Sequence, residues 1–486
     1  MSERLLHLLT YHSDEPMIFS SGLFLMVFLC FTFIYMLLQR TLTLRLLFVT
    51  AFSYYFYYKS SGLYFGLLAV VTLSDYIIAR VLSVHRSKWL VALSLFIDLG
   101  LLGYFKYTNF FAGMWAQMVG SNFQPWDIFL PVGISFFTFQ SMSYVIDVYR
   151  GDLKPLPSLL DYAFYVSFFP QLVAGPIVRA RDFAPQIRKP LEITSQMFAQ
   201  GCYFIAIGLF KKAVISDYIS LNFVDRIFDN PSLYSGVENL LGVYGYTLQI
   251  YCDFSGYSDM AIGIALLLGF RFPMNFNAPY RSESITDFWR RWHISLSSWI
   301  RDYIYISLGG NRKGKVRQYV NLIITMLLGG LWHGASLNFV AWGGMHGVAL
   351  ALHKWTREHV FRHDKHYHST GLRRLLSVLL TFHFVAFCWI FFRNHTFEAS
   401  WVMITQIATN FHPELFEQVV TGYWIVFAMM LFGYVTHFVP DTFQARCVRV
   451  LEWGGVVLCA LLITAVIYLV IQVKSSEIQP FIYFQF

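Results

Sequence analysis

The sequence predicts an all-α protein that crosses a membrane many times. Of its 486 residues, 56% are hydrophobic and only 13% are charged, whereas soluble domains carry about 25% charged residues. The apolar residues gather in runs, and about 20 of them in a row can cross a bilayer as one helix. The net charge of +8 is spread over loops between these runs, so no separate basic domain for nucleic acid is expected.

The apolar runs suggest about eleven transmembrane helices, together with re-entrant or interfacial helices. In chain order, the apolar runs from which this count is made cover residues 17–38, 42–57, 62–83, 89–107, 126–148, 158–176, 195–218, 236–269, 318–352, 371–393, 421–439 and 452–473, and several of them are short or unusually long. Runs 236–269 and 318–352 are each long enough for two segments, or for a helix and a re-entrant piece. No linker or fixed-period repeat divides the chain, so residues 1–486 are expected to form one integral membrane domain.

The loop charges predict how the chain is oriented. Basic residues follow the first and third runs, at Arg40, Arg45, Arg86 and Lys88. Such loops stay in the cytoplasm, which puts the N-terminal segment 1–16 on the outer, periplasmic side. The most basic region, 281–317, is expected on the cytoplasmic side. Its positive charge can be explained by its role in setting the orientation of the chain alone. It can also be explained by the attraction of an anionic, phosphate-bearing donor from the cytoplasm, and the two explanations are compatible.

Two segments combine polar or helix-breaking residues with apolar ones. Pro170 and the Gly175-Pro176 pair break a helix at membrane depth, which is tolerated where the backbone is buried in protein or lines a cavity. A pore-lining or re-entrant element and a simple helix end both fit. Asp253, Ser255 and Asp259 interrupt the run 236–269. Because the two carboxylates are six residues apart and do not share a helix face, hydrogen bonding between helices around a polar cavity is favoured over direct catalysis.

Two histidines are candidates for chemistry. His333 follows Trp332 in a glycine-rich segment within an apolar run, and an ionisable residue at membrane depth is a functional candidate by default. A buried, hydrogen-bonded structural histidine is the alternative. His293 lies forty residues earlier, among tryptophans at helical spacing that are typical of an interfacial helix. His346 and His353 are seven residues apart on one helix face, as packing or supporting groups.

Several common sites are not predicted. The six cysteines stand singly with no C-x-x-C pair, so neither a disulfide framework nor a zinc cluster is indicated. The chain has no H-E-x-x-H motif for a zinc protease and no G-x-S-x-G elbow for an α/β-hydrolase. We therefore expect no metal site and no bound cofactor.

Six segments together resemble the membrane-bound O-acyltransferase family, and most closely its bacterial alginate O-acetyltransferase branch. They are Leu130–Phe136, Tyr144–Arg150, Ala174–Pro176, Tyr251–Asp259, Phe288–Ser297 and Gly330–Gly334. The resemblance covers nearly the whole chain from about residue 17, and residues 395–450 are less distinctive. It implies a helical bundle around a central funnel or tunnel, in a bacterial inner membrane.

The resemblance also implies roles for individual residues. The family's catalytic histidine corresponds to His333, within the region 318–352, and its second tunnel histidine corresponds to His293. The remaining candidates for substrate binding are Trp332, Arg290, Arg291, Asp253, Ser255 and Asp259. The implied donor is cytoplasmic acetyl-CoA, acting as a co-substrate. The implied partner is a periplasmic acetyltransferase of the SGNH-hydrolase type, which passes the acetyl group to an exopolysaccharide.

Acyl transfer from a thioester needs a base for the attacking hydroxyl and a group that stabilises the oxyanion. We expect His333 to be the base and His293 to position or polarise the acyl group. One alternative is the same fold transferring D-alanine or another acyl group from a carrier-protein thioester to a cell-envelope polymer. A transporter with broken helices is a second alternative, but it predicts an inverted repeat that the sequence lacks. The polymer cannot be identified from the sequence.

Overall fold

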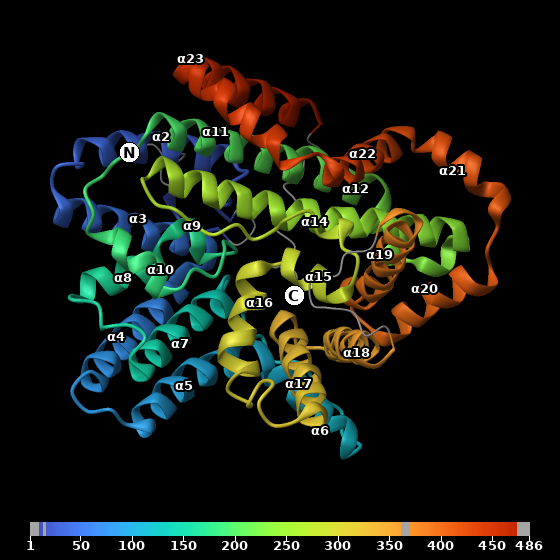
Figure 1. Ribbon diagram of the computed structural model, residues 1–486, viewed down its shortest axis with the longest axis horizontal. Helices are drawn as coiled ribbons and strands as arrows, with labels where there is room; N and C mark the ends of the chain where they lie inside the picture. The colour runs from blue at the N-terminus through green and yellow to red at the C-terminus, as the bar shows by residue number, and fades with distance from the viewer. Residues whose placement is uncertain (1–8, 13–15, 361–369, 474–486) are drawn as a thin grey trace. The chain divides into compact units, whose positions relative to one another are not determined.

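The computed structural model describes residues 9–12, 16–360 and 370–473. Most of the N-terminal segment 1–16 therefore lies outside the described residues, and its periplasmic placement stays a prediction. Within the described ranges every regular element is a helix and there is no strand (Figure 1). The predicted all-α class is confirmed.

The chain divides into two compact units, each made from separate stretches of sequence. The first contains residues 1–205, 257–273 and 448–459, and the second contains residues 206–256, 274–447 and 460–486. Helices α11 (Ser195–Leu209), α14 (Gly236–Leu267) and α23 (Asp441–Val473) each contribute residues to both units. Both histidine candidates belong to the second unit.

The first unit is built mainly from the N-terminal helices. In chain order they are α2 (Gly22–Leu37), α3 (Leu42–Ser61), η1 (Gly62–Tyr64), α4 (Phe65–Leu82), α5 (Lys88–Leu102), η2 (Gly103–Tyr107), α6 (Thr108–Met118), α7 (Ile134–Arg150), α8 (Leu159–Ser167), α9 (Phe169–Leu172) and α10 (Ala180–Ile187). The predicted break near Pro170 is real, because α8 and α9 are separate short helices. All four residues of α9 are buried, and the Gln171 side-chain amide donates to the carbonyl of Tyr165. The irregular backbone is thus enclosed by protein, as membrane depth requires.

The second unit carries the remaining elements. Those before α15 are η3 (Phe210–Ser216), α12 (Asp217–Ile219), η4 (Ser220–Val224), α13 (Asp225–Asp229), η5 (Pro231–Leu233) and η6 (Pro279–Arg281). Those from α15 onward are α15 (Ile285–Arg291), α16 (Ile294–Ile300), η7 (Arg301–Tyr305), α17 (Lys315–His333), α18 (Leu337–His359), α19 (Gly371–Arg393), α20 (Phe397–Thr409), η8 (Pro413–Leu415), α21 (Phe416–Gly422), α22 (Trp424–Val435) and η9 (Thr436–Phe438). The long run 236–269 is one helix, α14, whereas the run 318–352 is two helices, α17 and α18.

Glycines bring α17 and α18 into close contact. A Cβ atom added to Gly330 would lie 2.2 Å from the carbonyl oxygen of Phe339, and one added to Gly343 would lie 2.3 Å from that of Met326. Small residues at such positions let two helix backbones approach each other. Immediately after His333, a Cβ on Gly334 would come within 1.9 Å of the Phe339 ring. Protein atoms therefore occupy the space beside these glycines, and they fix the end of α17 against the start of α18.

Five helical stretches are long and apolar enough to cross a membrane, and a sixth is possible if a bent pair forms one span. The five are Leu42–Leu82, Lys88–Met118, Ser195–Asp229, Gly371–Arg393 and Asp441–Val473, and the bent pair is Pro413–Gly422 with Trp424–Phe438. The protein is therefore a multi-pass membrane protein. The expected count of about eleven spans and the central funnel remain predictions.

Candidate active site

His333 is the last residue of α17 and is enclosed by aromatic rings. Its side chain is 2% exposed. The centroid of its imidazole lies 5.0 Å from that of Trp332, 5.1 Å from that of Trp342 and 5.2 Å from that of Phe392. The three interplanar angles lie between 70° and 85°, so each contact is edge-to-face. These rings come from α17, α18 and α19, and together they hold the imidazole in one orientation.

His293 occupies a strained backbone position between α15 and α16. Its φ of 42° and ψ of 57° put it in the left-handed region, which is uncommon for a residue with a side chain and recurs at functional sites. The residue is fully buried. The amide hydrogen of the next residue, Ile294, donates to the backbone carbonyl of Asn275 at 2.9 Å, which anchors this turn.

The side chain of Asn275 determines the tautomer of His293. Its Oδ1 lies 3.2 Å from Nδ1 of His293, and it also accepts from the backbone N–H of Ser295 at 3.2 Å and from the Ser295 hydroxyl at 2.9 Å. A backbone N–H can only donate, so this atom of Asn275 must be the oxygen. His293 therefore donates its Nδ1 hydrogen to Asn275, and in the neutral ring the lone pair is at Nε2.

Burial keeps His293 neutral. It lowers the pKa of the imidazole to about 3, because removing the ring from water disfavours its charged form. The surroundings are also apolar: the ring of Phe254, on α14, stands at 89° to the imidazole with centroids 4.6 Å apart. His293 is therefore a neutral hydrogen-bonding group across the physiological pH range.

The structure brings the two histidines to the same tryptophan. Trp332 is 3% exposed, and its ring centroid lies 5.0 Å from that of His333 and 6.1 Å from that of His293. Residues forty positions apart thus meet through one indole. Of the predicted site residues, His293, Trp332 and His333 form one cluster.

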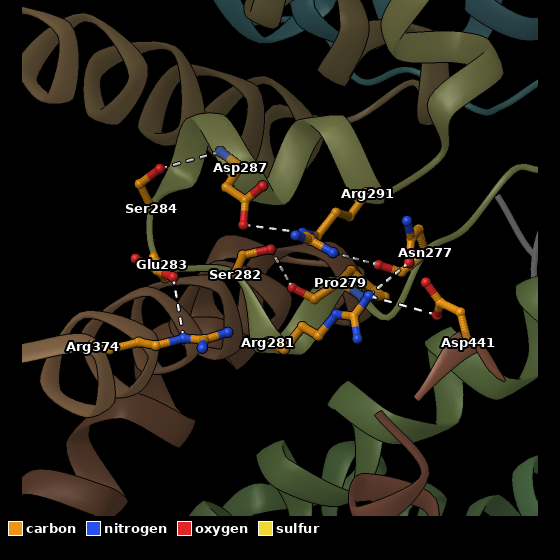
Figure 2. Close-up of polar contacts among 10 residues, drawn as sticks. All are labelled: Asn277, Pro279, Arg281, Ser282, Glu283, Ser284, Asp287, Arg291, Arg374 and Asp441. Carbon is orange, nitrogen blue, oxygen red and sulfur yellow. Dashed lines mark hydrogen bonds and ion pairs between the residues drawn. The ribbon is translucent and has the colours of Figure 1, made fainter. Parts of the chain in front are cut away.

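Two arginines, Arg290 and Arg291, lie on α15 about one turn before His293, and Arg281 lies on η6. The three side chains have different partners. Arg291 donates to Asp287 at 3.0 Å and to the backbone carbonyl of Asn277 (Figure 2). Arg281 donates to the side chain of Asn277 at 3.1 Å and lies 3.9 Å from Asp441. Arg290 is exposed.

Half of the eight cations in the basic segment 281–317 are ion-paired. These are Arg281, Arg291, Arg301 and Lys315. The exposed cations in the same segment that have no ion-pair partner among the described residues are Arg290, Arg312, Lys313 and Arg317. Only this second group is available to an anionic ligand without breaking an existing ion pair.

The segment of α14 that contains Asp253, Ser255 and Asp259 forms a buried ion pair with a lysine. Asp253 is 2% exposed and lies 2.6 Å from Nζ of Lys212, which also contacts Asp217 at 2.7 Å. This buried triad links α14 to the helices before it, in agreement with the interhelical bonding favoured from the sequence. Ser255 is buried two residues further on, and Asp259 belongs to the first unit. Phe254, which stands between Asp253 and Ser255 in the sequence, contacts His293.

Sequence reasoning missed three contributors to the cluster. Asn275 lies in a non-helical segment after α14, where no periodicity identifies it. Trp342 and Phe392 look like ordinary apolar residues of their helices.

The prediction that His346 and His353 share a face agrees with the structure, since both contact α15. His346 Nδ1 accepts from the Trp289 indole N–H at 3.2 Å, and His353 Nδ1 lies 2.9 Å from the Thr286 hydroxyl.

A cavity of about 1460 Å³ lies beside this cluster's helices, between α15, α18 and α19. Neither His293 nor His333 lines it, so the cavity and the histidine cluster are separate features of the second unit. Among the described residues, no group of three or more His, Cys, Asp or Glu side chains is arranged to hold a metal ion.

The sequence is similar to those of a known protein family and of several named proteins. Residues 150–360, which include both histidines, match the membrane-bound O-acyltransferase family. The chain is 42% identical to a probable alginate O-acetylase of Pseudomonas aeruginosa over 398 residues, covering 80% of this chain and 74% of that protein. It is 37% identical to a peptidoglycan O-acetyltransferase of Helicobacter pylori over 423 residues, covering 79% and 78%. A teichoic acid D-alanyltransferase of Bacillus subtilis is 31% identical over 282 residues, covering 55% and 69%.

Proposed function

Because the chain belongs to the membrane-bound O-acyltransferase family and is an O-acyltransferase, we propose that it transfers acetyl groups for the O-acetylation of an exported polysaccharide. The relatives named for acetylation of alginate and of peptidoglycan each align with about four fifths of this chain. The observation that carries the proposal is the cluster in which Trp332 contacts both His333 and His293. This cluster lies within the residues that match the family.

In the proposed reaction His333 is the general base. The acceptor hydroxyl attacks the thioester carbonyl carbon, and His333 takes the hydroxyl proton as the C–O bond forms. The C–S bond then breaks, and the thiolate leaves with a proton returned from the imidazolium. Proton transfer by a positioned side chain contributes about 10²–10⁴-fold to such a reaction. The aromatic enclosure supports this role because it fixes the imidazole and keeps water away from it.

The tautomer of His293 decides between the two roles expected for it. The sequence left open whether it positions or polarises the acyl group. With its Nδ1 hydrogen donated to Asn275, the ring presents a lone pair, and a lone pair accepts a hydrogen bond but cannot polarise a carbonyl oxygen. We therefore assign His293 to positioning the acyl group and not to polarising it.

The proposed donor is acetyl-CoA, a co-substrate delivered from the cytoplasm. Its phosphates would meet the exposed cations Arg312, Lys313 and Arg317, since such clusters attract anions over distance. Arg290 and Arg291 stay candidates for donor binding, although Arg291 would first have to release Asp287. The orientation implied by the loop charges puts this segment on the cytoplasmic side of a bacterial inner membrane.

The proposed acceptor route runs outward. A periplasmic acetyltransferase of the SGNH-hydrolase type would receive the acetyl group and pass it to the exopolysaccharide, through a tunnel between the helices. Transfer of D-alanine or another acyl group from a carrier-protein thioester is the second candidate. The D-alanyltransferase relative supports it, but over only 55% of this chain.

The first experiment compares donors. Purified protein in lipid vesicles is given acetyl-CoA with a labelled acetyl group, or a labelled D-alanyl carrier protein, and release of the free thiol is measured. We expect turnover with acetyl-CoA. Turnover with the carrier protein alone would replace the first candidate by the second.

The second experiment tests the base. We expect His333→Ala to lower the rate at least about 100-fold, while His383→Ala leaves it unchanged. His383 is a matched control because it is an exposed histidine on α19 whose ring contacts a carbonyl of its own helix. A folded His333→Ala protein that acetylates at the normal rate would refute the assignment of His333.

A further inference from the structure

The large cavity between α15, α18 and α19 has two chemically different ends. Its volume of about 1460 Å³ exceeds the ~300–1,000 Å³ usual for small-molecule sites. One end is lined by cationic and polar side chains: Arg290, His353, Thr356, Arg357, Arg373 and Ser377. The other is lined by apolar ones: Ala341, Val348, Leu352, Leu380, Phe384 and Phe391. Such a groove matches an amphiphile, with a charged head and hydrocarbon chains.

The polar end favours an anion. The two acids that line the cavity are already neutralised, since Glu283 pairs with Arg374 at 3.2 Å and Asp287 pairs with Arg291 at 3.0 Å (Figure 2). Arg290 and Arg357 also line the cavity, and neither has an ion-pair partner among the described residues, where the nearby acids pair with Arg291, Lys315 and Arg374. Burial and the positive charges of Arg357 and Arg290 both lower the pKa of His353. The unneutralised charge at this end of the groove is therefore positive.

The apolar end has the length of one membrane leaflet. From Leu352 to Ala341, α18 rises about 17 Å at 1.5 Å per residue, which is close to half of the ~30 Å hydrocarbon core. The opposite wall, α19, is one of the helices able to cross a membrane. Leu352 and Leu380 are 56% and 74% exposed, as expected for side chains that face hydrocarbon rather than water.

We propose that this groove binds an anionic glycerophospholipid of the surrounding bilayer, with its phosphate at Arg357 and its acyl chains along α18 and α19. The site is separate from the histidine cluster, and the proposal does not depend on which acyl donor the enzyme uses. A bound lipid would fill the groove and hold α18 against α19. Because α18 and α19 also supply Trp342 and Phe392 to the His333 enclosure, lipid occupancy would help to order that enclosure.

The test uses the full-length protein in detergent micelles. Phosphatidylglycerol, phosphatidylcholine with the same acyl chains, and glycerol 3-phosphate are added separately, and bound lipid is counted by native mass spectrometry. We expect phosphatidylglycerol to bind at least ten-fold more tightly than the other two. Equal binding of the two lipids, or binding of glycerol 3-phosphate as tight as that of phosphatidylglycerol, would overturn the proposal. Displacement of the bound lipid by acetyl-CoA would also overturn it, because the groove would then be a donor site.

Two pairs of variants localise the binding. Arg357→Gln should remove the preference for phosphatidylglycerol, whereas Arg357→Lys and the exposed control Arg312→Gln should keep it. Val348→Trp should fill the groove and weaken both lipids about ten-fold, whereas Val320→Trp should not. Val348 and Val320 are 53% and 39% exposed on neighbouring helices, and only Val348 lines the groove. Unchanged lipid binding in folded Arg357→Gln and Val348→Trp proteins would place the lipid elsewhere.

Discussion

Replacing Asn275 by alanine should reduce both the stability and the activity of the protein. Three donors converge on its Oδ1: Nδ1 of His293, and the backbone N–H and hydroxyl of Ser295. All three residues are at most 5% exposed, so water cannot replace the lost amide. At about 1 kcal/mol net for each hydrogen bond, the loss comes to about 3 kcal/mol, and it rises if the buried donors stay unsatisfied.

The activity should fall more than the stability suggests. Without the amide oxygen, nothing holds the Nδ1 hydrogen of His293 in its present direction, and the ring can change tautomer or rotate. A misplacement of about 1 Å near reacting atoms costs on the order of 100-fold in rate. Asn275→Asp keeps the shape but puts a negative charge beside Nδ1. It should raise the pKa of His293 above its present value of about 3, since a nearby opposite charge favours the imidazolium.

The assay combines unfolding midpoints in detergent with rates of labelled acetyl transfer, measured on the folded fraction. Asn277→Ala is the matched control. Asn277 is two residues away and exposed, and its Oδ1 accepts from Arg281 at 3.1 Å (Figure 2). That variant should change stability by less than about 0.5 kcal/mol. Equal midpoints and equal rates for Asn275→Ala and Asn277→Ala would refute the role given to Asn275.

Three further predictions concern stability, each measured by reversible denaturation. Because the folded chain keeps His293 neutral down to about pH 3 while the unfolded chain takes up a proton below about pH 6.5, stability should fall as pH drops through this window. The slope contributed by His293 should reach about 1.4 kcal/mol per pH unit, and an equally steep slope in His293→Gln would contradict this. Gly334→Ala should cost about 1–3 kcal/mol, because the new Cβ would overlap the Phe339 ring, whereas Gly344→Ala, 3.4 Å from Leu327, should cost far less. Asp253→Ala should cost about 3–5 kcal/mol by leaving Lys212 buried with one partner fewer; a loss no larger than in the exposed control Asp229→Ala would count against the triad.

Composition and motif order predicted the fold class, but helix breaks within apolar runs could not be predicted reliably. Glycines and polar residues in 236–269 suggested an interruption, yet α14 is continuous. A Cβ on Gly256 would lie 2.7 Å from the carbonyl oxygen of Gly208. This glycine therefore serves the packing of a neighbouring helix and does not end its own. Such a contact joins residues far apart in sequence, and no local pattern reports it.

Some residues of the candidate site could likewise be predicted from the sequence, and others could not. His333, Trp332 and His293 were identifiable because polar or aromatic residue types stand in unusual local contexts. Asn275 was not, because its importance comes from a hydrogen bond across 18 residues. The basic segment 281–317 was visible from the sequence, but its pairing was not. Which arginine meets a carboxylate depends on tertiary contacts such as that between Arg281 and Asp441.

The two histidines have surroundings that suit different parts of the proposed reaction. A base must be neutral before it takes the proton and cationic afterwards. The rings of Trp332 and Trp342 stand edge-to-face with the His333 imidazole, with centroids at 5.0 and 5.1 Å, and they fix its orientation. In the proposed reaction these rings hold the imidazole in place while it takes up the proton and returns it. His293 is held by a neutral amide and is buried, which penalises its charged form. In the proposed reaction the His333 imidazole therefore changes charge, whereas that of His293 stays neutral and positions the acyl group.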